Sequence, residues 1–344
     1  MTVKITLPHD NSYEIFIDEL NELYFDRKVV IITNPTVSGF HLEYLKTKIN
    51  ARELSVCTIP DGEEYKHMQT IEDMLAHCFT HRLDRKSLLI AFGGGVIGDM
   101  TGFAASIYQR GIDFVQIPTT LLSQVDASVG GKTGINNKFG KNLVGAFHQP
   151  IAVYIDPNFL KTLPKREFGA GVAEIVKMAV TFNKDFFEWL EQNDLTTDEN
   201  IRIAIAKSVQ TKADVVSQDE KELGIRAALN YGHTFGHVIE NETNYDTYLH
   251  GEAVGIGMCM ANALAVKLGL MSKDEELRVK NLLEKYDIPT TYKIKDIEDF
   301  YEHFFLDKKS LDNKIKFILP VGIGDCKITN EVTKNDVIEI LKGF

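Results

Sequence analysis

The 344-residue sequence lacks several features that would place it outside the cytoplasm. Its four cysteines, Cys57, Cys78, Cys259 and Cys326, lie far apart and form no CxxC pair. Such isolated cysteines are typical of buried thiols in a reducing compartment. No apolar run approaches the roughly 20 residues that a membrane span requires, and the N-terminus has no apolar signal-peptide core. We therefore expect a cytoplasmic protein without a membrane partner.

Positive charge is also scarce. The 38 basic residues are outnumbered by 49 acidic residues, for a formal net charge of −11, and no basic stripe interleaves with aromatic residues. Because nucleic-acid binding needs positive charge to displace counterions, we expect no nucleic-acid partner. An anionic ligand is still possible if lysines and arginines gather in one pocket.

The first half of the chain has the pattern of an α/β domain. Apolar runs typical of buried strands occur at 28–33, 53–59, 87–94, 113–118 and 151–156. Helical patterns, such as the one at 68–83, separate them. This alternation predicts a Rossmann-like parallel sheet with right-handed crossovers.

The second half changes character near residue 157. From residue 158 onward the chain reads mostly as amphipathic helices, and only 314–320 resembles a strand. We therefore expect an α/β domain at 1–157 and a mostly α-helical domain at 158–344. No low-complexity linker separates them, so we expect the two domains to pack closely with a cleft between them.

A glycine-rich turn follows the run at 87–94. Its pattern is GGGxxGD, from Gly93 to Asp99. Glycines after a parallel strand let a helix N-terminus approach a pyrophosphate, although the same glycines could serve a tight turn with positive φ. The loops at 60–66 and 118–136 also follow strand ends, where ligands of open α/β sheets bind. Three such loops at one edge predict a dinucleotide site, and Asp61 and Glu63 are suited to ribose hydroxyls.

The segment 126–150 is rich in glycine, lysine and asparagine. Its GGKT sequence resembles the end of a P-loop, but Asp126 stands where the Walker pattern needs glycine, so a triphosphate P-loop is excluded. Two interpretations remain. The segment is either a flexible loop that offers ammonium and amide donors to a phosphate or carboxylate, or a solvated surface loop.

Three of the ten histidines lie between 231 and 254. His233 and His237 share one helical face, as in sites where two imidazoles bind one metal ion. His250 and Glu174 are candidates for further ligands, because a glutamate in an apolar helical run is costly unless it is paired or bound to metal. Glu174 could instead pair with Lys177 at i, i+3. Spacing alone does not decide which three of the four groups bind metal.

Further polar residues surround the histidines. Arg226, Asn230, His233 and His237 are spaced by four, three and four residues, which predicts that they form one helical stripe. Lys212 precedes this stripe and adds another cation. A stripe of this kind, if it faces a cleft, is typical of a polar binding surface.

Several long segments resemble the 3-dehydroquinate synthase family. They are GGGVIGDMTGFAASIYQRGIDFVQIPTTLLSQVDASVGGKTGIN, GKNLVGAFHQP, GVAEIVK, LNYGHTFGH and HGEAVGIGM. The resemblance implies conversion of 3-deoxy-arabino-heptulosonate 7-phosphate to 3-dehydroquinate and phosphate in the shikimate pathway. It implies NAD-mediated transient oxidation, phosphate β-elimination, reduction, ring opening and aldol closure. It also implies that Glu174, His233 and His250 bind zinc or cobalt, which leaves His237 for phosphate contact and proton transfer.

The resemblance assigns roles to the remaining polar residues. Lys212 and Arg226 would bind the substrate carboxylate, and Asp126 and Lys177 its hydroxyls. The phosphate would be bound by Lys132, Asn142, Asn230, His237 and, from the neighbouring subunit of a homodimer, Arg110, with a further contact from Lys308 or Lys309. With Asp61 added from the 60–66 loop, the expected NAD site consists of Asn34, Asp61, Glu63, Lys66, Gly94, Gly95, Val96, Ile97, Gly98, Asp99, Thr119, Thr120, Lys132, Lys141, Phe159, Thr162 and Leu163.

Three other functions compete with this interpretation. Another sugar phosphate cyclase would not need to bind a substrate carboxylate, whereas Lys212 and Arg226, which are suited to that role, are both present. A metal-dependent polyol dehydrogenase would not need the lysine-rich segment at 126–142. A non-catalytic NAD-binding protein would tolerate loss of a metal ligand, yet Glu174, His233 and His250 are all in place.

Overall fold

The computed structural model describes residues 1–8, 11–244, 246–305 and 315–344. The chain divides into two compact units. Unit 1 comprises residues 1–163 and 212–221, and unit 2 comprises residues 164–211 and 222–344. One division falls inside helix α6 (Asp198–Gln218), whose last residues belong to unit 1.

Unit 1 contains a seven-stranded sheet in the order β1-β2-β9-β6-β5-β3-β4. All neighbouring strands are parallel except β1 and β2, which are antiparallel. The strands are β1 (Thr2–Ile5), β2 (Tyr13–Ile17), β3 (Leu23–Thr33), β4 (Ile49–Thr58), β5 (Leu88–Gly93), β6 (Asp113–Pro118) and β9 (Ala152–Ile155). The expected Rossmann-like parallel sheet is therefore confirmed.

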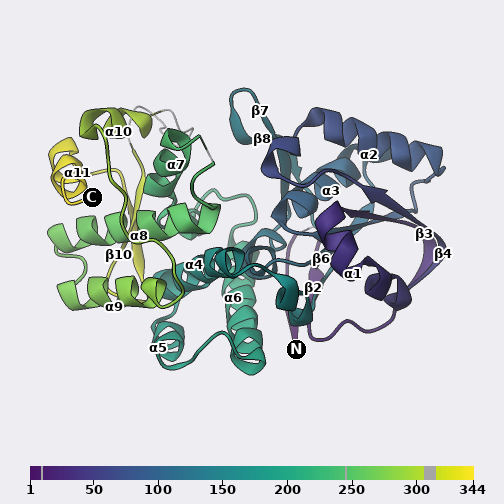
Figure 1. The fold of residues 1–344 in the computed structure, drawn as a ribbon, viewed down its shortest axis with the longest axis horizontal. Helices are drawn as coiled ribbons and strands as arrows, with labels where there is room; N and C mark the ends of the chain where they lie inside the picture. The colour runs from purple at the N-terminus through teal and green to yellow at the C-terminus, as the bar shows by residue number, and fades with distance from the viewer. Residues whose placement is uncertain (9–10, 245, 306–314) are drawn as a thin grey trace. The chain divides into compact units, whose positions relative to one another are not determined.

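Both faces of the central strands β5 and β6 are buried, which explains their continuous apolar runs in the sequence. The expectation of a buried strand at 53–59 was wrong, because β4 lies at the edge of the sheet and is partly exposed. On one face of the sheet, Val29 and Ile31 pack in a core that includes Leu45 of helix α1 (Pro35–Lys48). On the other face, Val30 and Ile32 share a core with helices α2 (Met68–Thr80) and α3 (Gly95–Ile107). Figure 1 shows these helices beside the strands. Each fully buried side chain of this kind contributes about 1.5–3 kcal/mol.

The segment expected to be a loop is a β-hairpin. Strands β7 (Lys132–Asn137) and β8 (Gly140–Phe147) pair antiparallel, and the Thr133 hydroxyl donates to the Ala146 carbonyl. A Cβ atom at Gly145 would lie 2.0 Å from the Thr133 carbonyl oxygen. The glycines that suggested flexibility therefore permit close approach of two strands, and the loop expectation was wrong.

Unit 2 is mostly helical, as expected. Its helices are α4 (Lys165–Phe182), α5 (Lys184–Gln192), the first part of α6, α7 (His233–Glu242), α8 (His250–Lys267), α9 (Lys273–Glu284), α10 (Ile297–His303) and α11 (Lys334–Leu341). Strand β10 (Phe317–Pro320) lies within the expected strand, but it pairs with β11 (Cys326–Thr329), which was not expected. Helix α8 is the centre of the unit, because residues 251–262 are all buried and the helix contacts α4, α7, α9, α11 and β10.

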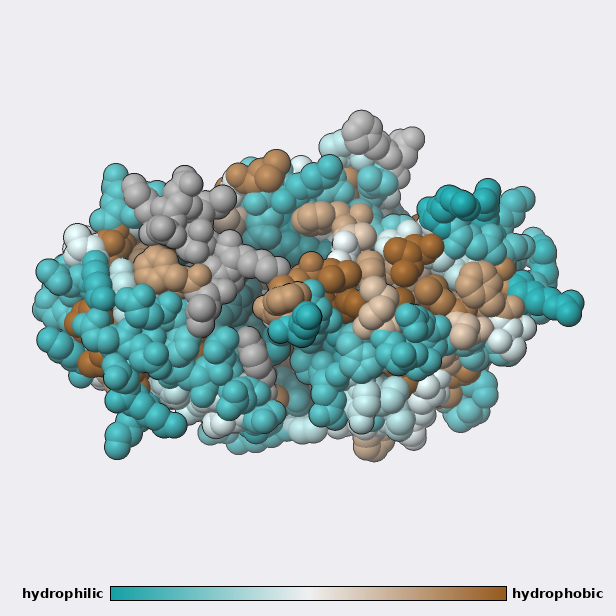
Figure 2. All heavy atoms as spheres, turned by 90° about the horizontal axis from the view of Figure 1, so that it is seen from above, coloured by the Kyte–Doolittle hydropathy of each residue, from teal (hydrophilic) through white to brown (hydrophobic). Residues whose placement is uncertain are grey.

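One face of the molecule is mostly polar (Figure 2). Hydrophilic residues cover most of the face drawn in Figure 2, and apolar residues gather there in separate patches. Across the described part of the chain, no helix combines the length and the apolar character needed to cross a membrane.

Candidate active site

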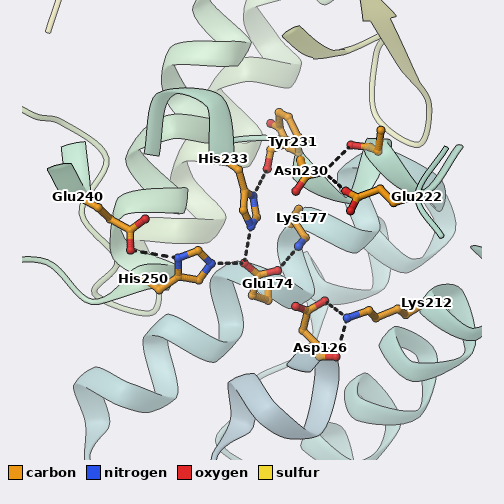
Figure 3. A network of polar contacts seen from close by, with 11 residues as sticks. Asp126, Glu174, Lys177, Lys212, Glu222, Asn230, Tyr231, His233, Glu240 and His250 are labelled. Atoms are coloured by element: carbon orange, nitrogen blue, oxygen red, sulfur yellow. Dashed lines mark hydrogen bonds and ion pairs between the residues drawn. The ribbon is translucent and has the colours of Figure 1, made fainter. Parts of the chain in front are cut away.

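Three candidate metal ligands meet in unit 2. Glu174 lies on α4, His233 begins α7 and His250 begins α8. One potential ligand atom from each residue lies within 4.8 Å of the other two. The Nε2 atoms of His233 and His250 lie 3.8 Å and 3.9 Å from the same oxygen of Glu174, Oε1 (Figure 3). Two consecutive helices, α7 and α8, and the more distant α4 therefore direct two nitrogens and one oxygen to a common point.

Hydrogen bonding fixes how the two imidazoles are presented. Nδ1 of His233 lies 3.2 Å from the Tyr231 carbonyl oxygen, and Nδ1 of His250 lies 3.3 Å from Oε1 of Glu240. Both partners are acceptors, so each Nδ1 carries a proton and donates it. The Nε2 atoms are then the ones that face Glu174 and can bind a cation. Burial lowers the pKa of His250, but the nearby Glu240 and Glu174 carboxylates outweigh burial and raise that pKa overall.

The Glu174 carboxylate has the surroundings of a cation ligand. It is 0% exposed, and among the described residues neither of its oxygens has a hydrogen-bond partner of normal geometry. It forms an ion pair with Lys177, so the pairing that competed with metal binding in the sequence is also present. A buried carboxylate needs such compensation, and a divalent cation held by one carboxylate and two imidazoles supplies it. The residues present therefore fit zinc or cobalt.

His237 stands apart from this three-residue cluster. Its ring centre lies 5.5 Å from that of His233 and 6.3 Å from that of His250. Both His233 and His237 are on α7, as their spacing predicted, but the cluster of converging ligand atoms contains Glu174 in place of His237. His237 is half-buried.

Glycines allow the three ligand-bearing helices to approach closely. A Cβ atom at Gly251 would lie 2.0 Å from the Ala170 carbonyl oxygen of α4. A Cβ atom at Gly257 would lie 2.0 Å from the Gly232 carbonyl oxygen, just before α7. Both distances are far below van der Waals contact, so α8 can carry His250 to this position only with glycine at these two points.

The stripe from Arg226 to His237 is not one helix, so that expectation was wrong. Arg226 and Asn230 lie in a short 3₁₀ helix, η5 (Ile225–Asn230), and α7 begins at His233. Gly232 separates the two with a left-handed φ of 81°. Arg226 is buried, and Nδ2 of Asn230 donates to Oε1 of Glu222 at 2.5 Å.

In unit 1, the glycine-rich turn forms the start of α3. None of Gly93, Gly94, Gly95 and Gly98 has a positive φ, so the turn does not need glycine for backbone conformation. Close approach explains two of them, because a Cβ atom at Gly93 would lie 2.6 Å from Ile97 and one at Gly98 would lie 2.6 Å from Gln116. Among the described residues, no side chain caps α3. Its first N–H groups are thus suited to a phosphate.

A partly buried network beside this turn joins residues 63–66, helix α3 and the β7–β8 hairpin. Nζ of Lys66 donates to Asp99 and to Asn142, both at 2.6 Å. Nδ2 of Asn136 donates to Glu63 at 2.8 Å, and the Asn142 backbone N–H donates to Asn136 at 2.9 Å. Burial lowers the pKa of Lys66, but the Asp99 and Glu63 carboxylates raise it overall, so the ammonium stays charged. Asn142, expected at the phosphate, thus lies among residues expected at NAD.

The other residues expected at NAD follow the carboxyl ends of the parallel strands. Asn34 follows β3 and accepts a hydrogen bond from Val37, which caps α1. The remaining residues follow β4, β5, β6 and β9, and because these strands are parallel their carboxyl ends meet at one edge of the sheet. The contacts of these residues are Asp61 with Thr36, Thr120 with Ser123, Thr162 with His41, and Phe159 with the buried ring of Phe92.

The accessibility of these residues differs. Thr119 and Ile97 are buried, whereas Val96 and Leu163 are half-buried. Leu163 directly follows the 3₁₀ helix η4 (Pro157–Thr162) and caps its C-terminal end. Lys132 and Lys141 lie on the hairpin, and Arg110 is exposed with a left-handed φ of 76°.

Asp126 and Lys212 form a pair in unit 1. Nζ of Lys212 lies 2.8 Å from Oδ1 of Asp126 and 2.6 Å from its backbone oxygen (Figure 3). Lys212 is buried, so this contact balances a charge that would otherwise be costly. Lys308 and Lys309 lie outside the described residues.

One residue at the site was not anticipated. Glu240 is buried and contacts His250, although the sequence interpretation gave it no role. It lies three residues after His237, next to Val238 and Ile239, which are both buried. The same argument that singled out Glu174, a glutamate among apolar residues of a helix, would have found it.

Comparison with known proteins agrees with this geometry. Family models described as 3-dehydroquinate synthase N-terminal and C-terminal match residues 56–170 and 171–310. A 3-dehydroquinate synthase of Sulfurovum sp. (strain NBC37-1) is 66% identical over 346 residues, which cover 100% of this chain and 99% of that protein.

Solved structures of related cyclases share the whole fold. A 2-epi-5-epi-valiolone synthase from Streptomyces hygroscopicus subsp. jinggangensis 5008, with NAD⁺ and Zn²⁺ bound, has a TM-score of 0.86 at 27% identity and covers 99% of both chains. A 2-deoxy-scyllo-inosose synthase complexed with carbaglucose-6-phosphate, NAD⁺ and Co²⁺ has a TM-score of 0.87 at 25% identity and covers 100% of both chains. Identity to 3-dehydroquinate synthases is far higher, and the chain belongs to the 3-dehydroquinate synthase family.

Proposed function

We propose that this protein converts 3-deoxy-D-arabino-heptulosonate 7-phosphate to 3-dehydroquinate and phosphate, with NAD and one divalent metal ion as cofactors. The observation that carries this proposal is the convergence of Glu174, His233 and His250 in a member of this family. The reaction belongs to the shikimate pathway that leads to chorismate and the aromatic amino acids. Two related cyclase structures contain NAD⁺ together with Zn²⁺ or Co²⁺, which supports the choice of cofactors.

The metal ion would be held by Glu174, His233 and His250. When bound with three protein ligands, zinc or cobalt lowers the pKa of a coordinated hydroxyl and polarises a ketone. Lys177 contributes a second positive charge, because its ammonium is buried against Glu174. We propose that Lys177 and Asp126 hydrogen-bond to substrate hydroxyls and hold them in position for oxidation.

The cations and amides would bind the two anionic ends of the substrate. Lys212 and Arg226 are proposed to bind the carboxylate, for which a guanidinium fork has suitable geometry. The Lys212–Asp126 ion pair would be exchanged for this contact. The residues proposed to bind the phosphate are Lys132, Asn142, Asn230, His237 and, from a neighbouring subunit, Arg110.

His237 is the proposed acid–base group. It is half-buried and lies beside the metal ligands without belonging to their cluster. A neutral imidazole there can accept a proton as phosphate leaves, and imidazolium can return it. Ring opening and aldol closure would then need little beyond holding the substrate conformation.

NAD would bind at the carboxyl edge of the parallel sheet in unit 1. When bound there, NAD would supply a hydride acceptor that is regenerated in each turnover, so a trace of it would suffice. The uncapped start of α3 would face the pyrophosphate, and Glu63, Lys66 and Asp99 would lie beside it in their hydrogen-bonded network. We propose that residues 1–157 carry most of the NAD site and residues 158–344 carry the metal ligands. Phe159, Thr162 and Leu163 would complete the NAD site, and the substrate would be bound by residues from both ranges.

The assembly and location of the protein are also proposals. The role given to Arg110 requires a homodimer, and a biosynthetic enzyme of this family with buried thiols is expected in the cytoplasm. Another sugar phosphate cyclase activity remains the second candidate. It is favoured by the likeness to the two solved cyclases, but it does not explain the buried cations Lys212 and Arg226.

Phosphate release tests the proposed function. Purified protein is given the heptulosonate phosphate, a divalent metal and a trace of NAD, and phosphate and NADH absorbance are followed. We expect phosphate far in excess of NAD, with no accumulation of NADH. Lys212→Ala should abolish most of this activity, whereas Lys207→Ala, an exposed lysine on the same helix, should not. No phosphate release by the wild-type protein would refute the proposal, and accumulation of NADH with a polyol would indicate a dehydrogenase.

A further inference from the structure

We propose that Glu240 is a positioning residue that orients and strengthens His250 as a metal ligand. The carboxylate of Glu240 is 3% exposed, and its Oε1 lies 3.3 Å from Nδ1 of His250. Nε2 of the same ring lies 3.9 Å from Glu174 Oε1. The imidazole therefore lies between two buried carboxylates, one on each side of the ring, as Figure 3 shows. This inference rests on the metal site proposed above.

The position of Glu240 on α7 explains how it reaches His250. The helix begins at His233, and Glu240 lies seven residues later, two turns along the same helix. Residues at i and i+7 share one helical face, so α7 directs a metal ligand and the carboxylate partner of another ligand toward the same side. His250 is the first residue of α8, and its ring also contacts the rings of His233 and His237.

The two histidine ligands have different outer partners. His233 donates from Nδ1 to the carbonyl oxygen of Tyr231, a neutral acceptor. His250 donates to a carboxylate, and charge-assisted hydrogen bonds are roughly twice as strong as neutral ones. A carboxylate on the remote nitrogen fixes the tautomer and makes the imidazole a better donor to a cation. His250, which is more exposed than His233, therefore receives the stronger outer support.

The burial of Glu240 is easier to explain with this role than without it. A buried carboxylate is costly unless charges or hydrogen bonds compensate for it. A purely structural contact between the end of α7 and the start of α8 would be made equally well by neutral side chains. A carboxylate that serves a cation through His250 gains from the positive charge of that cation.

Cation affinity and cobalt absorption test the inference. Metal-depleted wild-type, Glu240→Ala and Glu240→Gln proteins are titrated with Co²⁺ against a chromophoric chelator, and the visible absorption of bound Co²⁺ is recorded. We expect the alanine variant to bind about 10–100-fold more weakly, as is typical when the outer partner of a ligand is lost. The glutamine variant keeps an acceptor oxygen without the charge, so its loss should be smaller. Both variants should also shift the cobalt absorption.

Two further variants separate the possible outcomes. Glu191→Gln changes a partly buried glutamate of α5, whose carboxylate accepts from Arg278, and it should bind Co²⁺ as the wild type does. Glu174→Gln should abolish binding. If the wild-type protein fails to bind Co²⁺, or Glu174→Gln binds normally, the metal site itself is wrong. If the site behaves as proposed but the Glu240 variants keep wild-type affinity and absorption, or Glu191→Gln loses as much, only the role of Glu240 is overturned.

Discussion

At the scale of single residues, the ammonium of Lys66 connects helix α3 and strand β8. This buried ammonium donates to Asp99 and Asn142 in a partly buried network. Lys66→Met leaves Asp99 without this partner, so we expect the free energy of unfolding to fall by about 1–3 kcal/mol. Lys28→Met removes a surface pair with Glu53 and should change it by less than about 1 kcal/mol. If urea unfolding showed equal losses of unfolding free energy in the two variants, the contacts of Lys66 would contribute no more than a surface ion pair.

The four thiols give a second prediction. Burial raises the pKa of Cys57 and Cys326 to about 11 and that of Cys78 and Cys259 to about 12. Only the thiolate is nucleophilic, and hardly any thiolate exists at neutral pH with such values. Native protein should therefore react slowly with a chromogenic disulfide reagent, whereas denatured protein should release four equivalents. Fast reaction of the native protein would show that these thiols are accessible and ionised.

Residue spacing predicted part of the candidate site. The i, i+4 relation of His233 and His237 correctly placed both on one helix. This spacing could not place Glu174 beside the histidines, because α4 contacts α8 through tertiary packing that spacing does not encode. The ligand set came from the family resemblance, and the structure brings those three residues together. The contact of Asn142 with Lys66 depends on the fold of a hairpin that was read as a loop.

At the scale of helices and strands, glycine contacts set the distances between the ligand-bearing helices. Gly251→Ala would force a Cβ atom to within 2.0 Å of the Ala170 carbonyl oxygen. Because this neighbour is backbone, α4 and α8 must separate, and we expect a loss of about 3 kcal/mol or more in unfolding free energy. Gly39→Ala provides the matched control. Gly39 lies inside α1 with no atom within 4 Å of the new Cβ, so thermal unfolding should show stabilisation by about 0.5–1 kcal/mol.

The N-terminus of α9 carries a pH-dependent cap. Ser272 and Glu275 form a capping box, and backbone and side-chain hydrogen bonds from Ser272 lower the pKa of Glu275. A carboxylate with a lowered pKa stabilises the fold above its unfolded pKa and loses this contribution as pH falls through its folded pKa. Glu275→Gln should therefore cost about 0.5–2 kcal/mol near neutral pH and less below about pH 4. A cost that stays constant from pH 7 to pH 3 would contradict this assignment.

Helices and strands could be predicted from the sequence where their own residues determine them, and were missed where they depend on contacts with distant segments. Strand β6 coincides with the apolar run at 113–118, because a strand buried on both faces needs apolar residues throughout. Strand β11 was missed because its pattern is only partly buried, and its pairing with β10 is a tertiary contact. The break at Gly232 had a signal, because a glycine inside a helical pattern often marks an end.

At the scale of the whole molecule, the proposed cation should act on stability. A ligand that binds only the folded state stabilises it, by about 2.7 kcal/mol at a hundredfold excess over its dissociation constant. Adding Zn²⁺ or Co²⁺ to metal-depleted protein should raise its thermal midpoint, and a chelator should reverse the effect. Glu174→Gln should show no such rise. An equal rise in that variant would place the stabilising ion elsewhere.

The fold class was predictable because hydrophobic period and strand–helix alternation extend over many residues. The membership of residues 212–221 in unit 1 was not predictable, since it depends on contacts between segments far apart in the chain. Those contacts include Lys212 with Asp126, Ser217 with the Thr6 backbone N–H, and Glu220 with Gln149.

These three contacts also have a consequence for folding during translation. Synthesis runs from the N-terminus, so residues 1–163 emerge well before residue 221 and must wait for a segment that returns to them. Until residues 212–221 have emerged, the ammonium of Lys212 cannot pair with Asp126. The backbone N–H of Thr6 likewise cannot donate to the hydroxyl of Ser217. We therefore expect unit 1 to complete its folding only after residue 221 has been synthesised. Residues 1–163 should be more sensitive to protease in a nascent chain stalled before residue 212 than in one stalled after residue 221 has left the ribosome.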